Sequence, residues 1–169
     1  MRTKGEPCIA VPFCFWRIMI QSFILSKKQA LCSELRVSLD CFISKLDEFL
    51  NSFERKDFFA LSLTEEQIDF YKDKFALFRS QSAAPLEKVT ETMGQASSLL
   101  VEADANMLED VTLSLSIMLE RYAIFENTLS SFFNMGASAF KESCISLSML
   151  SGGGKKLRFT AEELKSSAK

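Results

Sequence analysis

The sequence contains no histidine, and this absence excludes several kinds of catalytic chemistry. Histidine is the commonest general base and the commonest metal ligand, and it activates serine and cysteine nucleophiles. Helical di-metal sites that use a Glu-x-x-His motif are excluded for the same reason. We therefore expect no enzyme activity, no metal, no cofactor and no small-molecule substrate.

Glycine and proline are also scarce, with 6 and 3 residues among 169. Because these residues interrupt helices, their scarcity favours long uninterrupted elements. No stretch alternates polar and apolar residues for long, so no β-strand is expected. A composition of 47% hydrophobic and 25% charged residues is typical of one globular domain with its own core.

The chain has no excess of basic residues, and its formal net charge is −2. Nucleic-acid binding needs a basic face that neutralises phosphates, so we expect no nucleic-acid partner. The five cysteines include no Cys-x-x-Cys pair, which argues against a zinc site. Cys32 falls on an apolar helical line, so we expect a reduced thiol buried in the core.

The clearest pattern runs from Leu108 to Phe132, where apolar residues recur at alternating steps of three and four. These residues are Leu108, Val111, Leu115, Met118, Tyr122, Phe125, Leu129 and Phe132. The spacing forms a heptad line along an α-helix. A second apolar line lies beside it and gives the helix a second apolar face; its members are Leu113, Ile117, Leu119, Ile124 and Phe133. We predict a central helix that other helices cover on two sides and that ends near Gly136.

A similar line predicts a first long helix from Leu25 to Phe53. Its members are Leu25, Lys28, Cys32, Leu35, Leu39, Phe42, Leu46, Phe49 and Phe53. Acidic residues occupy the opposite side, as expected for a solvated face. The charged residues 54–57 then end the apolar repeat, and we interpret them as the solvated end of the helix.

The region between these two helices contains one helix start and one helix breaker. Thr64 and Gln67 form a capping-box signature, which predicts that a helix begins there. Pro85 disfavours a helix interior, so we expect this helix to stop before it and a third segment to cover 86–103. A turn is expected across 104–106, and the alternative is a continuous helix with a one-residue change of phase.

Three consecutive glycines at 152–154 predict the end of the bundle, because glycine frees the backbone. A weaker helix over 139–150 precedes them. The predicted fold class is all-α: an antiparallel bundle of three to four long heptad-patterned helices with a flexible C-terminal tail. A three-arm bundle that bends at Pro85 and a four-helix bundle are both compatible with this pattern. The predicted parts are an apolar N-terminal segment at 1–26, the bundle at 27–150, and a Gly-rich linker and tail at 151–169.

The two ends of the chain supply the candidate contacts with other molecules. Residues 1–26 are apolar but interrupted by polar residues, so they fit a segment docked on the core, a membrane-interfacial anchor or a leader. In the tail, basic residues alternate with apolar ones. The candidate membrane or partner contacts are Trp16, Arg17, Lys155, Lys156, Arg158 and Phe159.

From these features we predict a non-enzymatic α-helical interaction or scaffold module. It would be a bundle or coiled-coil subunit that binds a protein partner or associates with itself. The alternative is a peripheral membrane protein held by its N-terminal segment or by its basic tail. The expected location is the cytoplasm, at a membrane surface in the alternative.

Overall fold

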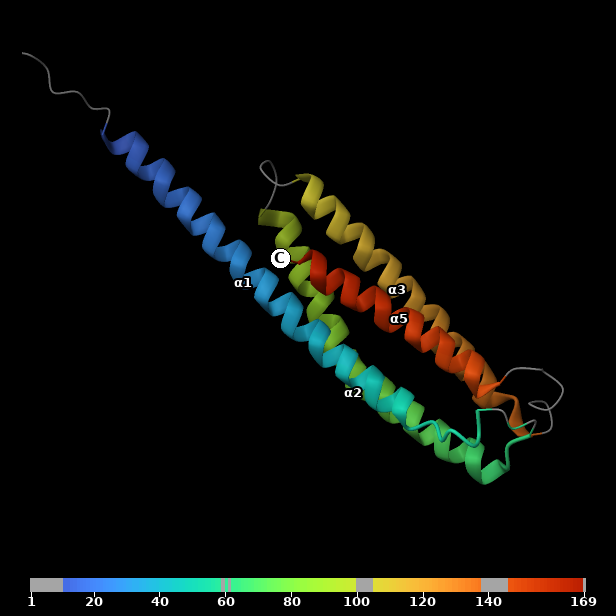
Figure 1. The fold of residues 1–169 in the computed structure, drawn as a ribbon. Helices are drawn as coiled ribbons and strands as arrows, with labels where there is room; N and C mark the ends of the chain where they lie inside the picture. The colour runs from blue at the N-terminus through green and yellow to red at the C-terminus, as the bar shows by residue number, and fades with distance from the viewer. Residues whose placement is uncertain (1–10, 59, 61, 100–104, 138–145, 169) are drawn as a thin grey trace, which may run out of the picture.

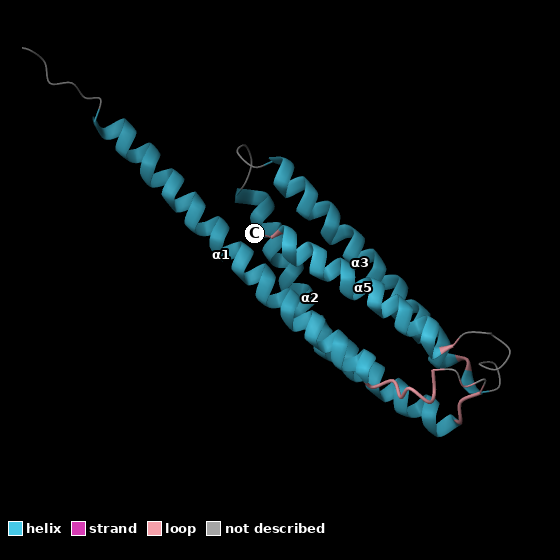
Figure 2. Cartoon of the chain, viewed as in Figure 1, coloured by secondary structure: helices cyan, strands magenta, loops and turns pink. Residues whose placement is uncertain are grey.

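The computed structural model describes residues 11–58, 60, 62–99, 105–137 and 146–168, and helices are its only regular elements there. The four long helices are α1 (Val11–Asn51), α2 (Glu65–Leu99), α3 (Ala105–Asn134) and α5 (Leu147–Ser167), as Figures 1 and 2 show. No strand occurs among the described residues. The predicted all-α class is therefore confirmed.

Each helix packs against two neighbours, so the four form a ring in the order α1, α2, α3, α5 (Figure 1). Contacts between aromatic side chains show that α1 and α2 are antiparallel. Phe42 packs against Phe78, whereas Phe53, just after the end of α1, packs against Tyr71 near the start of α2. Ion pairs likewise join α5 to α1 in the antiparallel sense, as they link Arg158 to Asp47 and Lys165 to Asp40. The architecture is an antiparallel four-helix bundle.

The contacts between α2 and α3 establish that the chain reverses between these two helices. Phe75 lies against Phe133, whereas Phe78 lies against Tyr122. Because the residue numbers rise in one helix as they fall in the other, the alternative of one continuous helix is wrong. The turn predicted at 104–106 overlaps residues outside the described ones, but α3 begins at Ala105 as a separate helix.

Two helix ends agree with the sequence prediction. At the start of α2, the backbone N–H of Thr64 donates to Gln67 Oε1 at 2.8 Å, and the N–H of Gln67 donates to Thr64 Oγ1 at 3.2 Å. This reciprocal pair is a capping box. After the end of α3, Gly136 has a φ of 75°, which favours glycine because it has no Cβ.

The predicted break before Pro85 is wrong, because α2 continues through this residue. Proline removes one helical hydrogen bond and disfavours a helix interior. Ser82, Leu86 and Val89 on either side of it are nevertheless buried against the bundle. Tertiary packing of one helix face therefore outweighs the local preference of proline, as it does for most helix stability in proteins.

The core contains most of the two predicted heptad lines. In α1 the line is buried from Leu35 to Phe53, whereas Cys32 is half-buried and Leu25 is exposed. The expectation of a core Cys32 is thus wrong. In α3 the described residues of the line are buried, except for the half-buried Tyr122. These lines therefore identify the faces that pack, although the first line extends beyond the packed region.

Part of the second apolar face of α3 is not covered by other helices. Leu113, Ile117 and Ile124 have exposed fractions of 60%, 38% and 59%. We call these three residues the α3 outer face. The prediction that other parts of the chain cover α3 on two sides agrees with its two neighbours, α2 and α5, and Leu119 and Phe133 of the second line pack on the core, but the α3 outer face is left uncovered.

The predicted linker and flexible tail are also wrong, because residues 151–167 form most of α5. Leu157, Ala161 and Leu164 are fully buried against the bundle. The glycines serve packing: a Cβ on Gly154 would lie 2.5 Å from Cδ2 of Leu50, so only glycine lets α5 approach α1 this closely. Of the weaker helix predicted at 139–150, residues 139–145 lie outside the described residues.

We expect opposite effects from substitutions at two glycines of α5. Gly152→Ala should raise the free energy of unfolding by about 0.5–1 kcal/mol, because its Cβ meets open space and alanine favours the helix. Gly154→Val should lower it by about 1–3 kcal/mol through overpacking against Leu50 and Phe125. Urea unfolding followed by circular dichroism measures both. Equal effects at the two positions would contradict the packing role of Gly154.

Candidate interaction surface

The first part of α1 projects beyond the other helices, as Figure 1 shows. We call residues 11–27 the α1 extension. Its described side chains, Met19 and residues 21–27, are all exposed, and the first buried hydrophobic residue of α1 is Leu35. Because α1 has 41 residues, it is about 60 Å long. The extension is thus a solvent-exposed helix held by the bundle at one end only.

Large apolar side chains gather on the α1 extension. Phe23, Ile24 and Leu25 are consecutive and have exposed fractions of 61%, 43% and 56%. Met19, one helical turn earlier, is 52% exposed. Single exposed apolar residues are normal on protein surfaces, whereas contiguous groups mark binding sites. The α1 extension carries four such residues on a helix end whose described side chains are all exposed, so we take it as the candidate for binding ahead of the α3 outer face, which has three.

The six candidate contacts predicted from the sequence fall into two separate places. Trp16 and Arg17 belong to the α1 extension, although their side chains lie outside the described ones. Lys155, Lys156 and Phe159 are exposed on α5. The sixth, Arg158, sits beside Asp47, and about 30 Å of α1 separates that point from the extension. The structure does not bring the two groups together.

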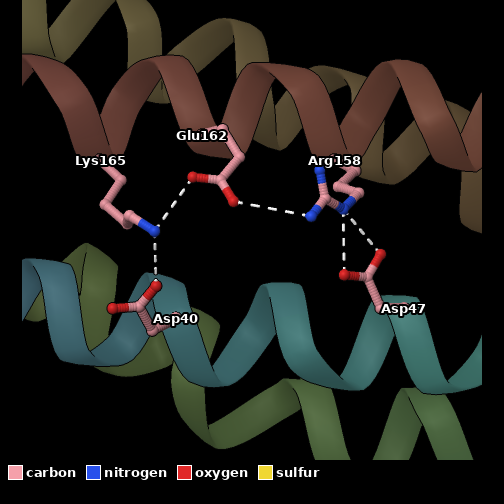
Figure 3. A network of polar contacts seen from close by, with 5 residues as sticks. All are labelled: Asp40, Asp47, Arg158, Glu162 and Lys165. Carbon is pink, nitrogen blue, oxygen red and sulfur yellow. Dashed lines mark hydrogen bonds and ion pairs between the residues drawn. The ribbon is translucent and has the colours of Figure 1, made fainter.

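Arg158 is engaged inside the chain by a network that joins α5 to α1 (Figure 3). Its Nε donates to both carboxylate oxygens of Asp47, at 2.7 and 3.0 Å. Lys165 Nζ lies 2.7 Å from Asp40 Oδ1 and 3.0 Å from Glu162 Oε2. The other carboxylate oxygen of Glu162, Oε1, lies 3.8 Å from Arg158 Nη2. The Asp47 carboxylate raises the pKa of Arg158. Because these side chains are partly exposed, we expect the network to add little to stability.

Asp57 is a buried charged residue that the sequence interpretation missed. Residues 54–57 were expected to be solvated, and 54–56 are exposed, but Asp57 is only 6% exposed. Tyr71 Oη donates to Asp57 Oδ2 at 2.5 Å, and Gln67 Nε2 donates to Oδ1 at 3.0 Å. No local pattern signals this role, because both partners belong to the next helix.

Acidic and cysteine side chains are dispersed over the described part of the chain. None of its residues form a cluster of three or more acidic or cysteine side chains that could hold a metal ion. Both carboxylate oxygens of the buried Asp57 already accept hydrogen bonds within the fold. Among the described helices, none has the length and apolar character needed to cross a membrane. The exposed apolar residues of α1 therefore remain the feature that most needs a functional explanation.

Antiparallel four-helix bundles carry many unrelated functions, so the fold alone does not define one. Comparisons with protein-family models, with curated proteins and with solved structures gave no match for this chain. The function must therefore be inferred from the exposed surfaces of the chain itself.

We expect Tyr71→Phe to lower the free energy of unfolding by about 1–3 kcal/mol, because it removes a hydrogen bond to a buried carboxylate. Burial, together with the bond to Asp57, raises the pKa of Tyr71 to about 12. An unfolded tyrosine ionises near pH 10, so the stabilisation by Tyr71 is complete below pH 10 and is lost as the pH rises toward 12.

The difference in unfolding free energy between the wild type and Tyr71→Phe should therefore shrink between pH 10 and pH 12. Urea titrations across this range measure it. Tyr122→Phe is the control, since it removes the hydroxyl of a half-buried tyrosine that does not bond to Asp57. At neutral pH it should lower the free energy of unfolding by less than Tyr71→Phe does. A difference that stays constant up to pH 12 would contradict the role assigned to the Tyr71 hydroxyl.

Proposed function

We propose that this chain is a non-enzymatic helical interaction or scaffold module. In this proposal the four-helix bundle is a support, and the α1 extension is the element that binds. The supporting observation is the exposure of Phe23, Ile24 and Leu25 on a helix that is continuous with the core. A rigid bundle can hold such a helix in place without help from the partner.

Burial of the α1 extension against a partner would be favourable. Removing apolar surface from water contributes about 25 cal/mol for each Å². Leu25 and Lys28 continue the line that is buried from Leu35 onward, so a helix of a partner chain could extend the same packing as a coiled coil. Such an arrangement would make the chain a subunit of a larger helical assembly.

A non-enzymatic role agrees with the chemistry available to the chain. The sequence has no histidine, and the described residues include no metal-binding cluster. Arg158 and Asp57 are both occupied by contacts within the fold. Lys155, Lys156 and Phe159 stay exposed on α5 and form a second, smaller candidate contact.

We expect the purified chain to associate in aqueous buffer when no partner is present. Light scattering should then give a mass above that of the monomer, and Phe23→Ser with Leu25→Ser should shift the mass toward the monomer. The matched control is Leu113→Ser with Ile124→Ser, which removes two exposed apolar residues from the α3 outer face. This control should associate like the wild type.

A wild-type chain that is monomeric and binds no apolar dye would argue against the proposal. A loss of association in the control pair alone would assign binding to the α3 outer face instead. Circular dichroism should show that all variants keep the helical fold, because every substituted residue is exposed.

A further inference from the structure

The side of α1 that faces away from the core carries a stripe without charged residues. Leu35, Leu39 and Leu46 point into the bundle and are buried. On the opposite side of the helix, at 100° for each residue, eight uncharged residues fall within about 80° of its circumference. We call these residues the α1 outer stripe. All of them are exposed, and they are Met19, Phe23, Ser26, Ala30, Ser33, Val37, Cys41 and Ser44.

The α1 outer stripe has the spacing of a helix-packing seam. Its members follow one another at steps of three or four residues, as the core residues of a coiled coil do. The large apolar ones, Met19, Phe23 and Val37, have exposed fractions of 52%, 61% and 66%. The stripe is about 38 Å long, so it runs from the α1 extension onto the part of α1 that forms the bundle. A partner helix lying on it would contact both parts.

The charge of α1 changes sign along its length. Residues 11–33 contain three basic residues and no acidic one, whereas 34–51 contain four acidic and two basic residues, a net charge of −2. Two copies of α1 lying antiparallel would place the basic half of each beside the acidic half of the other. A parallel pair would place like charges together. The charge therefore favours a second copy of this chain, in the antiparallel direction.

One pair of charged residues selects the register of such a pair. Lys27 and Glu34 lie two helical turns apart along the same edge of the stripe. In an antiparallel pair the same edges of the two stripes meet, and residues at the edges of a seam form ion pairs between helices. A two-fold axis between Ala30 and Leu31 brings Lys27 level with Glu34 of the second copy. Symmetry then gives two such ion pairs.

Both charged groups are accessible to a second copy. Lys27 is exposed, and its Nζ lies 5.5 Å from the centroid of the Phe23 ring. Glu34 lies 3.7 Å from Lys88 Nζ, and both of these side chains are about half exposed. These contacts within the chain leave room for an additional partner.

The same register also matches the sizes of the apolar side chains. Phe23 lies nearly level with Val37 of the second copy, and Ala30 lies at the axis beside its own copy. The small alanine lets the two helices approach to the usual separation of about 8–10 Å. Each stripe faces away from its own core, so the two bundles lie on opposite sides of the helix pair and do not collide.

From the stripe, the change of charge along α1 and the register of Lys27 with Glu34, we propose that two copies of this chain associate through their α1 outer stripes. The pair is antiparallel and has two-fold symmetry. This inference rests on the proposed function, because it names the partner of the α1 extension. It also adds Ala30 and Val37, which lie outside the extension, to the binding surface.

A charge exchange in the full chain tests the register by sedimentation equilibrium. Lys27→Glu alone and Glu34→Lys alone should each raise the dissociation constant of the dimer about five- to thirtyfold, because each turns two attractive pairs into repulsive ones. The double variant restores opposite charges and should dimerise like the wild type. The matched controls are Lys72→Glu and Glu163→Lys, which make the same changes at exposed residues of α2 and α5 and should have no effect.

Two substitutions test the stripe itself. Ala30→Arg places a long charged side chain beside its own copy at the axis and should abolish the dimer. Val37→Ser should raise the dissociation constant by at least about tenfold, because both copies lose a buried valine. Each residue is exposed in the single chain, so circular dichroism should show an unchanged helical fold.

The exposed thiol of Cys41 tests the direction of the helices. In the antiparallel pair the two Cys41 residues lie about 32 Å apart along the helix axis, so oxidation should not join them. In a parallel pair they would be neighbours. A dimer linked through Cys41, identified by mass spectrometry of its peptides, would overturn the antiparallel arrangement.

The remaining outcomes separate the inference from the proposed function. Association that survives Ala30→Arg and Val37→Ser but is lost in the variant with Phe23→Ser and Leu25→Ser would reject the α1 outer stripe and leave the proposed function intact. Failure of the charge exchange to restore dimerisation would reject the register. A wild-type chain that does not associate at all would reject the inference and count against the proposed function as well.

Discussion

Phenylalanine rings from three helices meet at the centre of the bundle, and the positions of all four helices depend on this contact. The ring of Phe49 lies 5.2 Å from that of Phe78 and 6.3 Å from that of Phe125, and the last two are 6.4 Å apart. These residues belong to α1, α2 and α3. Aromatic pairs at such distances contribute beyond the area that they bury.

The fourth helix, α5, approaches this group of phenylalanines at Gly154, which has no side chain. A Cβ on Gly154 would lie 3.2 Å from Cζ of Phe125 and closer still to Leu50, so glycine leaves the space that these two side chains fill. The neighbouring turns of α5 then bury Leu157 and Leu164. The cost of glycine in a helix is thus offset by close packing between α5 and the aromatic centre.

The apolar spacing of this sequence was sufficient to predict an all-helical chain, the extent of α3 and the capping box of α2. It failed at Pro85, at Gly154 and at Asp57, where a residue contradicts its usual local preference. In each case the deciding contact comes from a residue distant in sequence or from burial of the flanking helix turns. Spacing alone also cannot show where neighbouring helices end, so it does not reveal that Leu25 and Lys28 lie beyond the packed part of the line.

The candidate binding residues were predictable in part. The apolar character of the N-terminal segment pointed to Trp16 and Arg17, but it did not reveal that Phe23 to Leu25 stand outside the bundle. The basic residues near the C-terminus looked alike in sequence. Only the fold separates Arg158, which binds Asp47, from Lys155 and Lys156, which remain exposed. The number of helices that cover a residue depends on tertiary structure, which periodicity does not encode.

The continuity of α1 has a mechanical consequence. One uninterrupted helix runs from Val11 to Asn51, and its second half forms a side of the bundle. Between Met19 and Phe42 it contains no proline or glycine that would act as a hinge. The helix is therefore stiff along its length. A molecule that binds its free end would also fix the orientation of the bundle and its distance from the binding site.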